Sequence, residues 1–326
     1  KPGVDTVEAI SQMLAGQGKV FFALGGNFAA ATPDTYETWK ALQRCDLTVH
    51  VTTKLNRSHL VHGREALILP CLGRTEIDMQ ASGAQGVTVE DSMSMVHLSM
   101  GINPPASEHL LSEPAIVARL AAATLGGRSN TPWLWLVEDY RRIRDLIEKV
   151  FPDFADFNTR VAAPGGFRLR NTASERVWAT ASGKASFYTH PVPRDTPSHL
   201  ARERVRDTVV FTLLTTRSHD QYNTTIYGMD DRYRGVYGQR RVVFINAQDI
   251  RELGMKDGDW VDIQTLWSDG QERRADRFKL VAYDIPRGNL AAYYPETNPL
   301  VPLSAVADVA GTPTSKSIPV VLVRHV

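Results

Sequence analysis

Short apolar runs alternate with amphipathic segments in the first third of the chain. Continuous apolar runs at Lys19–Leu24, Leu47–Val51 and Ala66–Leu69 predict buried strands. Between the first two, Pro33–Cys45 has helical spacing, with Thr32 expected as the N-cap and the proline in the first turn. Alternation of strands and helices at this spacing predicts a parallel sheet covered by helices.

Further strands and helices are predicted up to about residue 155. We expect a short helix at Asn56–His62, a strand at Gly86–Asp91 and an alanine-rich helix at Pro114–Leu125. A charged amphipathic helix is expected over Leu136–Val150, ending before Pro152. Residues 163–194 are rich in glycine and proline and contain only short segments of alternating apolar and polar residues. This composition indicates a connecting arm rather than a core.

From Thr208 onward the pattern becomes all-β. A short helix, Ala247–Leu253, ends at Gly254, and the turn Lys256–Asp259 leads into the next strand. Five or six short strands with one helix plugging the end predict a closed barrel. The expected strands are Val209–Leu214, Val242–Ile245, Val261–Thr265, Arg277–Val281 and Val320–Val323, with Arg287–Asn289 as a turn.

Together these patterns predict an α/β domain at 1–155, a connecting arm at 156–204 and a β-barrel at 205–326. The length of 326 residues is sufficient for two separate cores. Because the sequence opens with Lys-Pro-Gly and no methionine, we interpret it as a piece of a longer protein.

Charge and composition narrow the class of partner. With 37 basic and 36 acidic residues the net charge is +1, so no electrostatic argument favours nucleic acid or an acidic membrane. No apolar run approaches the roughly 18 residues of a membrane span, and no signal peptide opens the chain. Cys45 and Cys71 fit a reducing compartment, and two cysteines cannot hold an iron–sulfur cluster by themselves. We therefore expect a cytoplasmic protein.

Several familiar catalytic signatures are missing, among them the P-loop, H-E-x-x-H, G-x-S-x-G and paired C-x-x-C. Gly25-Gly26-Asn27 follows the first strand, but it is not the G-x-G-x-x-G fingerprint of NAD binding. Two interpretations stay open for it: a plain turn, or a loop whose backbone approaches a phosphate or pterin at the carboxyl end of a parallel strand.

A second polar loop, Thr52–His59, follows the second strand. Hydroxyls, amides and a base at the same sheet edge suit a nucleotide head group, whereas a cluster of helix-capping residues is the alternative. His62 and His97 are interpreted as structural.

The barrel half has a similar polar loop, Thr215–Asn223, directly after a buried strand. Its Arg217 offers a guanidinium fork suited to phosphate oxygens. Two further polar loops, Tyr294–Asn298 and Gly311–Lys316, come late in the barrel. Taken singly, each is more typical of a surface loop than of a site.

Taken together and in order, these segments resemble the C-terminal half of the bis-molybdopterin guanine dinucleotide oxidoreductases. That family includes formate dehydrogenases, periplasmic-type nitrate reductases and dimethyl sulfoxide reductase. INAQDIRELGMKDGDWVDIQT, at 245–265, resembles its barrel signature, and TTRSHDQYN, at 215–223, resembles its Arg/His loop. TTKLNRSHLVHGREALILPC, at 52–71, is similar to the formate-dehydrogenase-like subgroup called YdeP-like.

The resemblance implies a Rossmann-like parallel α/β domain followed by a double-psi β-barrel that holds bis-molybdopterin guanine dinucleotide, with molybdenum or tungsten. The partners implied are this pterin dinucleotide and the N-terminal half of the parent chain. It implies the following cofactor-binding residues in the two domains: Gly26, Asn27, Thr53, Asn56 and His59, and Arg217, His219, Asn223, Asn298 and Lys316.

In this family the metal ligand and the cysteines of the 4Fe-4S cluster lie upstream, and nothing in this sequence matches them. No catalytic or metal-ligating residue is therefore assigned, and the chain alone is expected to be inactive. A different class of function, a non-catalytic double-psi barrel that binds a nucleotide or a protein, stays open, because fold alone does not decide function. A parent protein that keeps the cofactor but has lost dehydrogenase activity is a third possibility.

Overall fold

The computed structural model describes residues 3–326, which form two compact units. The first unit combines the chain up to His50 with Leu55–Ile68 and Val192–Val326. The second contains Val51–Lys54 and Leu69–Pro191. The first α/β segments and the barrel therefore belong to one unit, although more than a hundred residues separate them in the sequence.

The chain begins with alternating helices and strands, as predicted. In order these are α1 (Thr6–Leu14), β1 (Val20–Leu24), α2 (Phe28–Ala31), α3 (Thr35–Gln43), β2 (Leu47–Thr52), the 3-10 helix η1 (Arg57–Leu60) and β3 (Glu65–Pro70). The strands form one sheet in the order β1-β2-β3. The amide of Glu65 donates to Asp46 and that of Cys71 to Thr52, so pairing advances in the same direction along β2 and β3, as in parallel strands. The Rossmann-like assignment of this domain stays a prediction.

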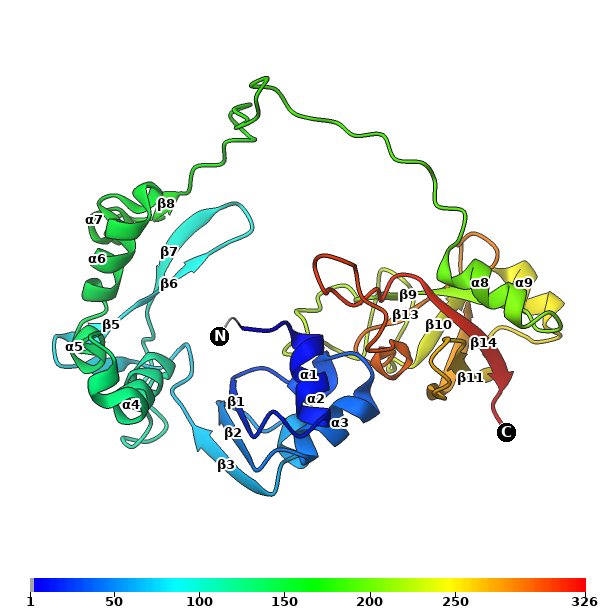
Figure 1. Ribbon diagram of the computed structural model, residues 1–326, viewed down its shortest axis with the longest axis horizontal. Helices are drawn as coiled ribbons and strands as arrows, with labels where there is room; N and C mark the ends of the chain where they lie inside the picture. The colour runs from blue at the N-terminus through cyan, green and yellow to red at the C-terminus, as the bar shows by residue number, and fades with distance from the viewer. Residues whose placement is uncertain (1–2) are drawn as a thin grey trace. The chain divides into compact units, whose positions relative to one another are not determined.

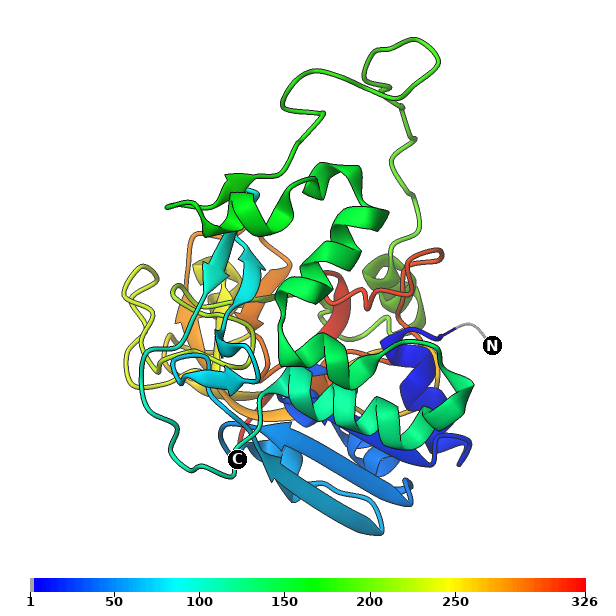
Figure 2. The same cartoon turned by 90° about the vertical axis from the view of Figure 1, so that its left-hand side faces the viewer.

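Helices α1 to α3 cover one face of this sheet (Figures 1 and 2). Their apolar side chains form a core with the sheet, in which the buried residues are Ile10, Met13, Ala29, Ala41, Leu42, Cys45 and Val61. The start of α3 differs from the prediction. Asp34, in a left-handed conformation with φ 49°, precedes the helix, while the Thr32 hydroxyl donates to the carbonyl of Phe28, the first residue of α2.

The barrel is closed and has six strands. They are β9 (Phe211–Thr216), β10 (Val242–Ile245), β11 (Trp260–Thr265), β12 (Arg274–Ala282), β13 (Asn289–Tyr293) and β14 (Ile318–Arg324), in the barrel order β10-β12-β11-β14-β9-β13. Two of the six pairings, β10 with β12 and β13 with β9, are parallel. The predicted barrel is confirmed. Strand β13 is not among the predicted strands, and its first residue, Asn289, lies at the end of the predicted turn.

The barrel interior is a dense apolar core built from every strand, and it includes Phe278, Leu280, Ile263 and Leu213, each fully buried. Full burial of such a side chain contributes about 1.5–3 kcal/mol. Helix α9 (Ala247–Glu252) packs Ile250 into this core and ends at Gly254, whose φ of 65° suits glycine. The predicted helix, glycine and turn are thus confirmed.

One buried ion pair joins the barrel to the α2–α3 segment within the first unit. Arg273 Nη2 lies 2.7 Å from Asp34 Oδ2, and both side chains are 4% exposed. Nearby, the Asn298 side-chain amide donates to the Ala30 carbonyl at 2.7 Å, and the Asp34 amide donates to the Asn298 carbonyl at 3.0 Å. These contacts fix the position of the 3-10 helix η4 (Asn298–Leu300).

The second unit has two small antiparallel sheets and a group of helices. Its elements are β4 (Asp78–Gln80), β5 (Gly83–Gln85), β6 (Val87–Glu90), β7 (Met95–Ser99), α4 (Glu113–Leu125), η2 (Gly126–Arg128), α5 (Trp133–Glu138), α6 (Arg141–Val150), η3 (Pro152–Phe154), α7 (Phe157–Ala162) and β8 (Phe167–Arg168).

The single helix predicted over Leu136–Val150 is wrong: α5 and α6 are separate helices. The chain turns extended at Asp139, with φ −151°. The next residue, Tyr140, is buried; its amide donates to Gln85 Oε1, and its hydroxyl bonds to Asp78 and Ser112. These long-range contacts outweigh the helical spacing.

The segment between β8 and the helix α8 (Pro197–Arg204) has no helix or strand, as expected of an arm (Figure 1). Phe187 and Tyr188 within it are almost fully exposed. Within residues 3–326, none of the helices combines the length and the apolar character that crossing a membrane requires.

Candidate functional site

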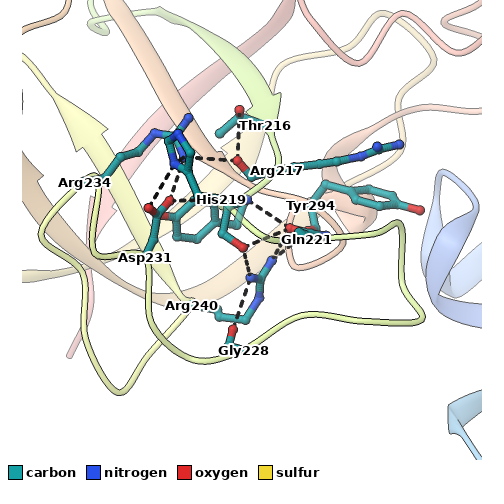
Figure 3. Close-up of polar contacts among 11 residues, drawn as sticks. Thr216, Arg217, His219, Gln221, Gly228, Asp231, Arg234, Arg240 and Tyr294 are labelled. Atoms are coloured by element: carbon teal, nitrogen blue, oxygen red, sulfur yellow. Dashed lines mark hydrogen bonds and ion pairs between the residues drawn. The ribbon is translucent and has the colours of Figure 1, made fainter. Parts of the chain in front are cut away.

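The loops at one end of the barrel are held together by Arg240 (Figure 3). Its buried guanidinium forms an ion pair with Glu296 at 2.7 Å and donates to Ser218 Oγ, Gln221 Oε1 and the Tyr294 carbonyl. One side chain therefore ties the loop after β9 to the loop after β13. Arg240 is largely saturated by protein partners, so its role is to position these loops.

Asp231 forms a second fixed point beneath the same loop. Its carboxylate is 1% exposed and accepts from Arg234 at 2.6 Å, Tyr293 Oη at 2.8 Å and His219 Nδ1 at 3.1 Å. Burial raises the pKa of Asp231, but the hydrogen bonds from Tyr293 and Arg234 outweigh burial and bring it to about 2. The His219 ring, pointing toward Asp231 in Figure 3, also packs on Tyr233 at a centroid distance of 4.3 Å. Its orientation is thus fixed, while its other edge stays partly exposed.

Two cationic side chains, Arg217 and Lys316, lie at the loop after β9. The Lys316 ammonium donates to the Thr215 carbonyl, and both burial and the nearby charge of Arg217 lower the pKa of Lys316. Arg217 contacts the Asn223 side-chain oxygen, and its guanidinium extends past Tyr294 (Figure 3). Like charges at close range, without an acid between them, favour an anion. The structure thus brings Arg217, Asn223 and Lys316 together, with His219 on the same loop.

The α/β segment supplies a second group of predicted residues. The Asn56 amide donates to the Gly26 carbonyl at 2.7 Å, and Ser58 Oγ donates to Asn27 Oδ1 at 3.0 Å. The Asn56 backbone N–H donates to His59 Nδ1 at 2.9 Å. The loops after β1 and β2 therefore form one cradle that contains Gly26, Asn27, Asn56 and His59.

His59 has a ring nitrogen without a partner. Its Nδ1 lies 2.9 Å from the Asn56 backbone N and 3.1 Å from the Asn56 carbonyl oxygen, so the tautomer decides which of its nitrogens donates. Its Nε2 is buried and has no partner among residues 3–326. A buried polar atom without a partner costs about 1–3 kcal/mol.

Two predicted residues lie elsewhere. Thr53 lines a separate cavity of about 380 Å³ in the second unit. Asn298 is buried, and its amide is occupied by the Ala30 carbonyl. Both assignments as cofactor-binding residues stay predictions.

A cavity of about 900 Å³ in the first unit connects the cradle to the barrel. Its lining includes Asn27 and Asn56 from the cradle and Arg240 and Glu296 from the barrel loops. The other charged and aromatic residues that line it are Arg57, Arg241 and Arg277, and Tyr36, Trp39, Tyr227 and Trp260. The cavity has the size, the aromatic faces and the cations that a nucleotide-bearing ligand requires.

Metal-binding chemistry has less support from this chain. In the described range 3–326, no three or more His, Cys, Asp or Glu side chains are grouped to hold a metal ion. Both cysteines are free thiols and buried, and burial raises the pKa of Cys71 to about 11. Neither is a reactive thiolate at neutral pH.

Sequence reasoning missed Asp231, Arg234 and Arg240, which organise the barrel loops. They lie in DDRYRGVYGQRR, at 230–241, a polar stretch directly before an apolar strand. The other candidate loops were also polar stretches next to apolar strands, so this pattern could have identified the segment. The partners could not be predicted, because Arg240 meets Glu296 from 56 residues away.

A six-stranded barrel with a cationic loop cluster at its end is the framework of a domain that binds an anionic dinucleotide. Residues 211–319 match the family described as molydopterin dinucleotide binding domain. This match confirms the resemblance drawn from the motifs.

Two relatives match nearly the whole chain. An uncharacterized oxidoreductase of Mycobacterium tuberculosis is 53% identical over 97% of this chain and 40% of its own length. Protein YdeP of Escherichia coli is 49% identical over 98% of this chain and 42% of its own length. The chain thus spans about two fifths of the length of these relatives. Acetylene hydratase from Pelobacter acetylenicus shares the fold, with a TM-score of 0.61 and 15% identity over 97% of this chain and 46% of that one.

Proposed function

We propose that this chain is the cofactor-binding C-terminal portion of a formate-dehydrogenase-like molybdenum oxidoreductase, and that it holds bis-molybdopterin guanine dinucleotide. The observation that carries the proposal is the pair of cations at the barrel end. Lys316 donates to the carbonyl of Thr215, two residues before Arg217 in the sequence, and no acid lies between the two cations among the contacts of the described residues. Burial and the charge of Arg217 both lower the pKa of Lys316.

The donor set fits such a cofactor. A pyrophosphate between Arg217 and Lys316 relieves their repulsion, and charge-assisted hydrogen bonds are the stronger class. The unpartnered Nε2 of His59, together with the side-chain amides of Asn27 and Asn56, offers polar atoms to the edge of a pterin or guanine. His219 is held by Asp231 so that its free edge faces outward.

The roles divide simply. When bound, the cofactor and its metal supply the redox chemistry. The residues of this chain bind and orient it: Arg217 and Lys316 neutralise phosphate charge, while Arg240 and Asp231 hold the loop that carries Arg217. The metal ligand and the iron–sulfur cysteines come from other parts of the parent protein in this proposal. Formate as the substrate is its most specific element, and the metal is molybdenum or tungsten.

The test is metal and pterin analysis of the intact parent protein, with formate-dependent dye reduction measured on the same preparation. Arg217→Ala is expected to lower the bound pterin at least tenfold, because it removes the fork that faces the phosphates. Arg251→Ala, an exposed arginine of α9, is the matched control and should retain full cofactor. A parent protein without pterin would refute the proposal; one with pterin and metal but without formate turnover would limit the error to the substrate.

A further inference from the structure

A β-bulge between β11 and β12 of the barrel indicates a phosphate-binding site. On β11 and β12, Val261 pairs with Phe278 and Ile263 with Ala275, so two residues of β12 face the single residue Asp262. Such a bulge bends the strand and redirects a side chain. The residue redirected here is Arg277.

The backbone at Arg277 is unusual. Its φ is 59°, in the left-handed region that favours glycine. The buried Asp262 carboxylate holds this conformation by accepting from the Arg277 backbone N–H at 2.8 Å and from His325 Nδ1 at 2.8 Å. A glycine would satisfy the same bulge without the steric cost, so the presence of arginine indicates a use for its side chain.

The arginine side chain faces the 900 Å³ cavity. Its guanidinium lies 5.3 Å from the centre of the Trp260 ring, which also lines the cavity. Among residues 3–326, neither Arg277 nor Arg57 on the same cavity has an acidic partner at ion-pair distance. Arg241, a third lining arginine, donates to the Asp276 carbonyl and lies 5.8 Å from the centre of the Phe278 ring.

The charge of the lining is strongly one-sided. Four arginines face one glutamate, a net charge of +3, whereas the whole chain carries +1. Among residues 3–326, Arg240 is the lining arginine that forms an ion pair, and its partner is Glu296. Unpaired guanidinium groups beside exposed aromatic faces match a phosphate ester attached to a planar ring, and the volume is too large for a small inorganic anion alone.

We propose that Arg277, displayed by the bulge over Trp260, binds the phosphate of a nucleotide-type ligand together with Arg57 and Arg241. The nucleotide can be the dinucleotide end of the cofactor, in which case this inference rests on the proposed function, or a free nucleotide. The chemistry recognised is the same in both cases.

The experiment measures binding of guanosine monophosphate by calorimetry to the purified protein, with guanosine and inorganic phosphate as separate probes. Arg277→Gly keeps the bulge and removes the guanidinium. We therefore expect the dissociation constant for guanosine monophosphate to rise at least tenfold. Guanosine should bind weakly and respond little to the change. Arg251→Ala is the matched control and should leave all three affinities unchanged. Arg57→Ala provides a second variant at a site without backbone strain.

Two results would overturn the inference: unchanged affinity for guanosine monophosphate in both Arg277→Gly and Arg57→Ala, or no binding of guanosine monophosphate to any form of the protein. Pterin content of the same preparation separates the sources. Loss of guanosine monophosphate binding in pterin-loaded protein assigns the phosphate to the cofactor, and equal binding with and without pterin assigns it to a free nucleotide. If pterin is retained while the Arg277 variant behaves as the parent does, only this inference fails, and the proposed function stands.

Discussion

At the scale of single residues, a strained backbone conformation occurs at a residue whose side chain faces the 900 Å³ cavity. Arg277 is the clearest case, because it occupies a left-handed backbone position inside a strand. Arg277→Gly should therefore stabilise the fold, by about 1 kcal/mol, the cost of a left-handed conformation for a residue with a Cβ. Chemical denaturation measures the change. Lys279→Gly, in the same strand with an ordinary conformation, should instead destabilise by about 0.5–1 kcal/mol; equal effects of the two changes would argue against strain at Arg277.

A second residue, Asp231, ties stability to pH. Its pKa in the folded protein is about 2, below the ordinary value of 3.8. A lowered folded pKa means that the carboxylate stabilises the fold fully above pH 4, and that this contribution is lost as the pH falls toward 2. The amount is about 2 kcal/mol at 1.36 kcal/mol for each pKa unit.

Unfolding by urea at pH 5 and at pH 3 measures this dependence. Asp231→Asn should lower stability at pH 5 and flatten the difference between the two pH values. The exposed Asp153→Asn serves as the control and should leave the pH profile unchanged. A profile equally steep in Asp231→Asn would assign acid sensitivity to other groups.

Helices, strands and turns were predicted correctly where the residues within a few positions along the chain determine the conformation. The helix, glycine and turn at Ala247–Asp259 are specified by neighbours within a few residues, and the structure reproduces them. The break at Asp139-Tyr140 was not predictable, because it depends on Gln85, 55 residues away. The same limit applies to the site. Polar loops after apolar strands led to the prediction of Arg217 and Asn56 as site residues, but the sequence could not show that the side-chain amide of Asn298 donates to the Ala30 carbonyl.

The junction between the barrel and the α2–α3 segment gives a prediction at the scale of elements. Arg273→Ala removes the partner of the buried Asp34 carboxylate and should destabilise the protein by about 3–5 kcal/mol, the usual cost of breaking a buried ion pair. Thermal or chemical unfolding measures this cost. Adding Asp34→Asn should recover part of the loss, since a neutral amide is less costly to bury and asparagine tolerates the left-handed conformation. No recovery in the double variant would mean that packing, not charge, dominates.

At the scale of the whole molecule, β3 is an exposed edge. It ends the sheet order β1-β2-β3, all six of its residues are exposed, and it includes Leu67, Ile68 and Leu69. An apolar edge strand invites pairing with another chain. We expect the 326-residue chain to self-associate, and Ile68→Lys to reduce this association in sedimentation or light-scattering measurements.

A matched change tests that edge. Val150→Lys, at an exposed apolar position at the end of α6, adds the same charge on a helix instead of on β3. It should leave the association unchanged. Equal improvement in both variants would show that net charge, rather than the edge of β3, controls self-association.

The buried ion pair between Asp34 and Arg273 also has a consequence for synthesis. Its partners are 239 residues apart in sequence. At about 5–20 residues per second, the ribosome leaves Asp34 without its arginine for roughly 10–50 s. Throughout that interval the first helices and strands lack the barrel that completes their unit, so they are the part of the nascent chain most dependent on chaperones.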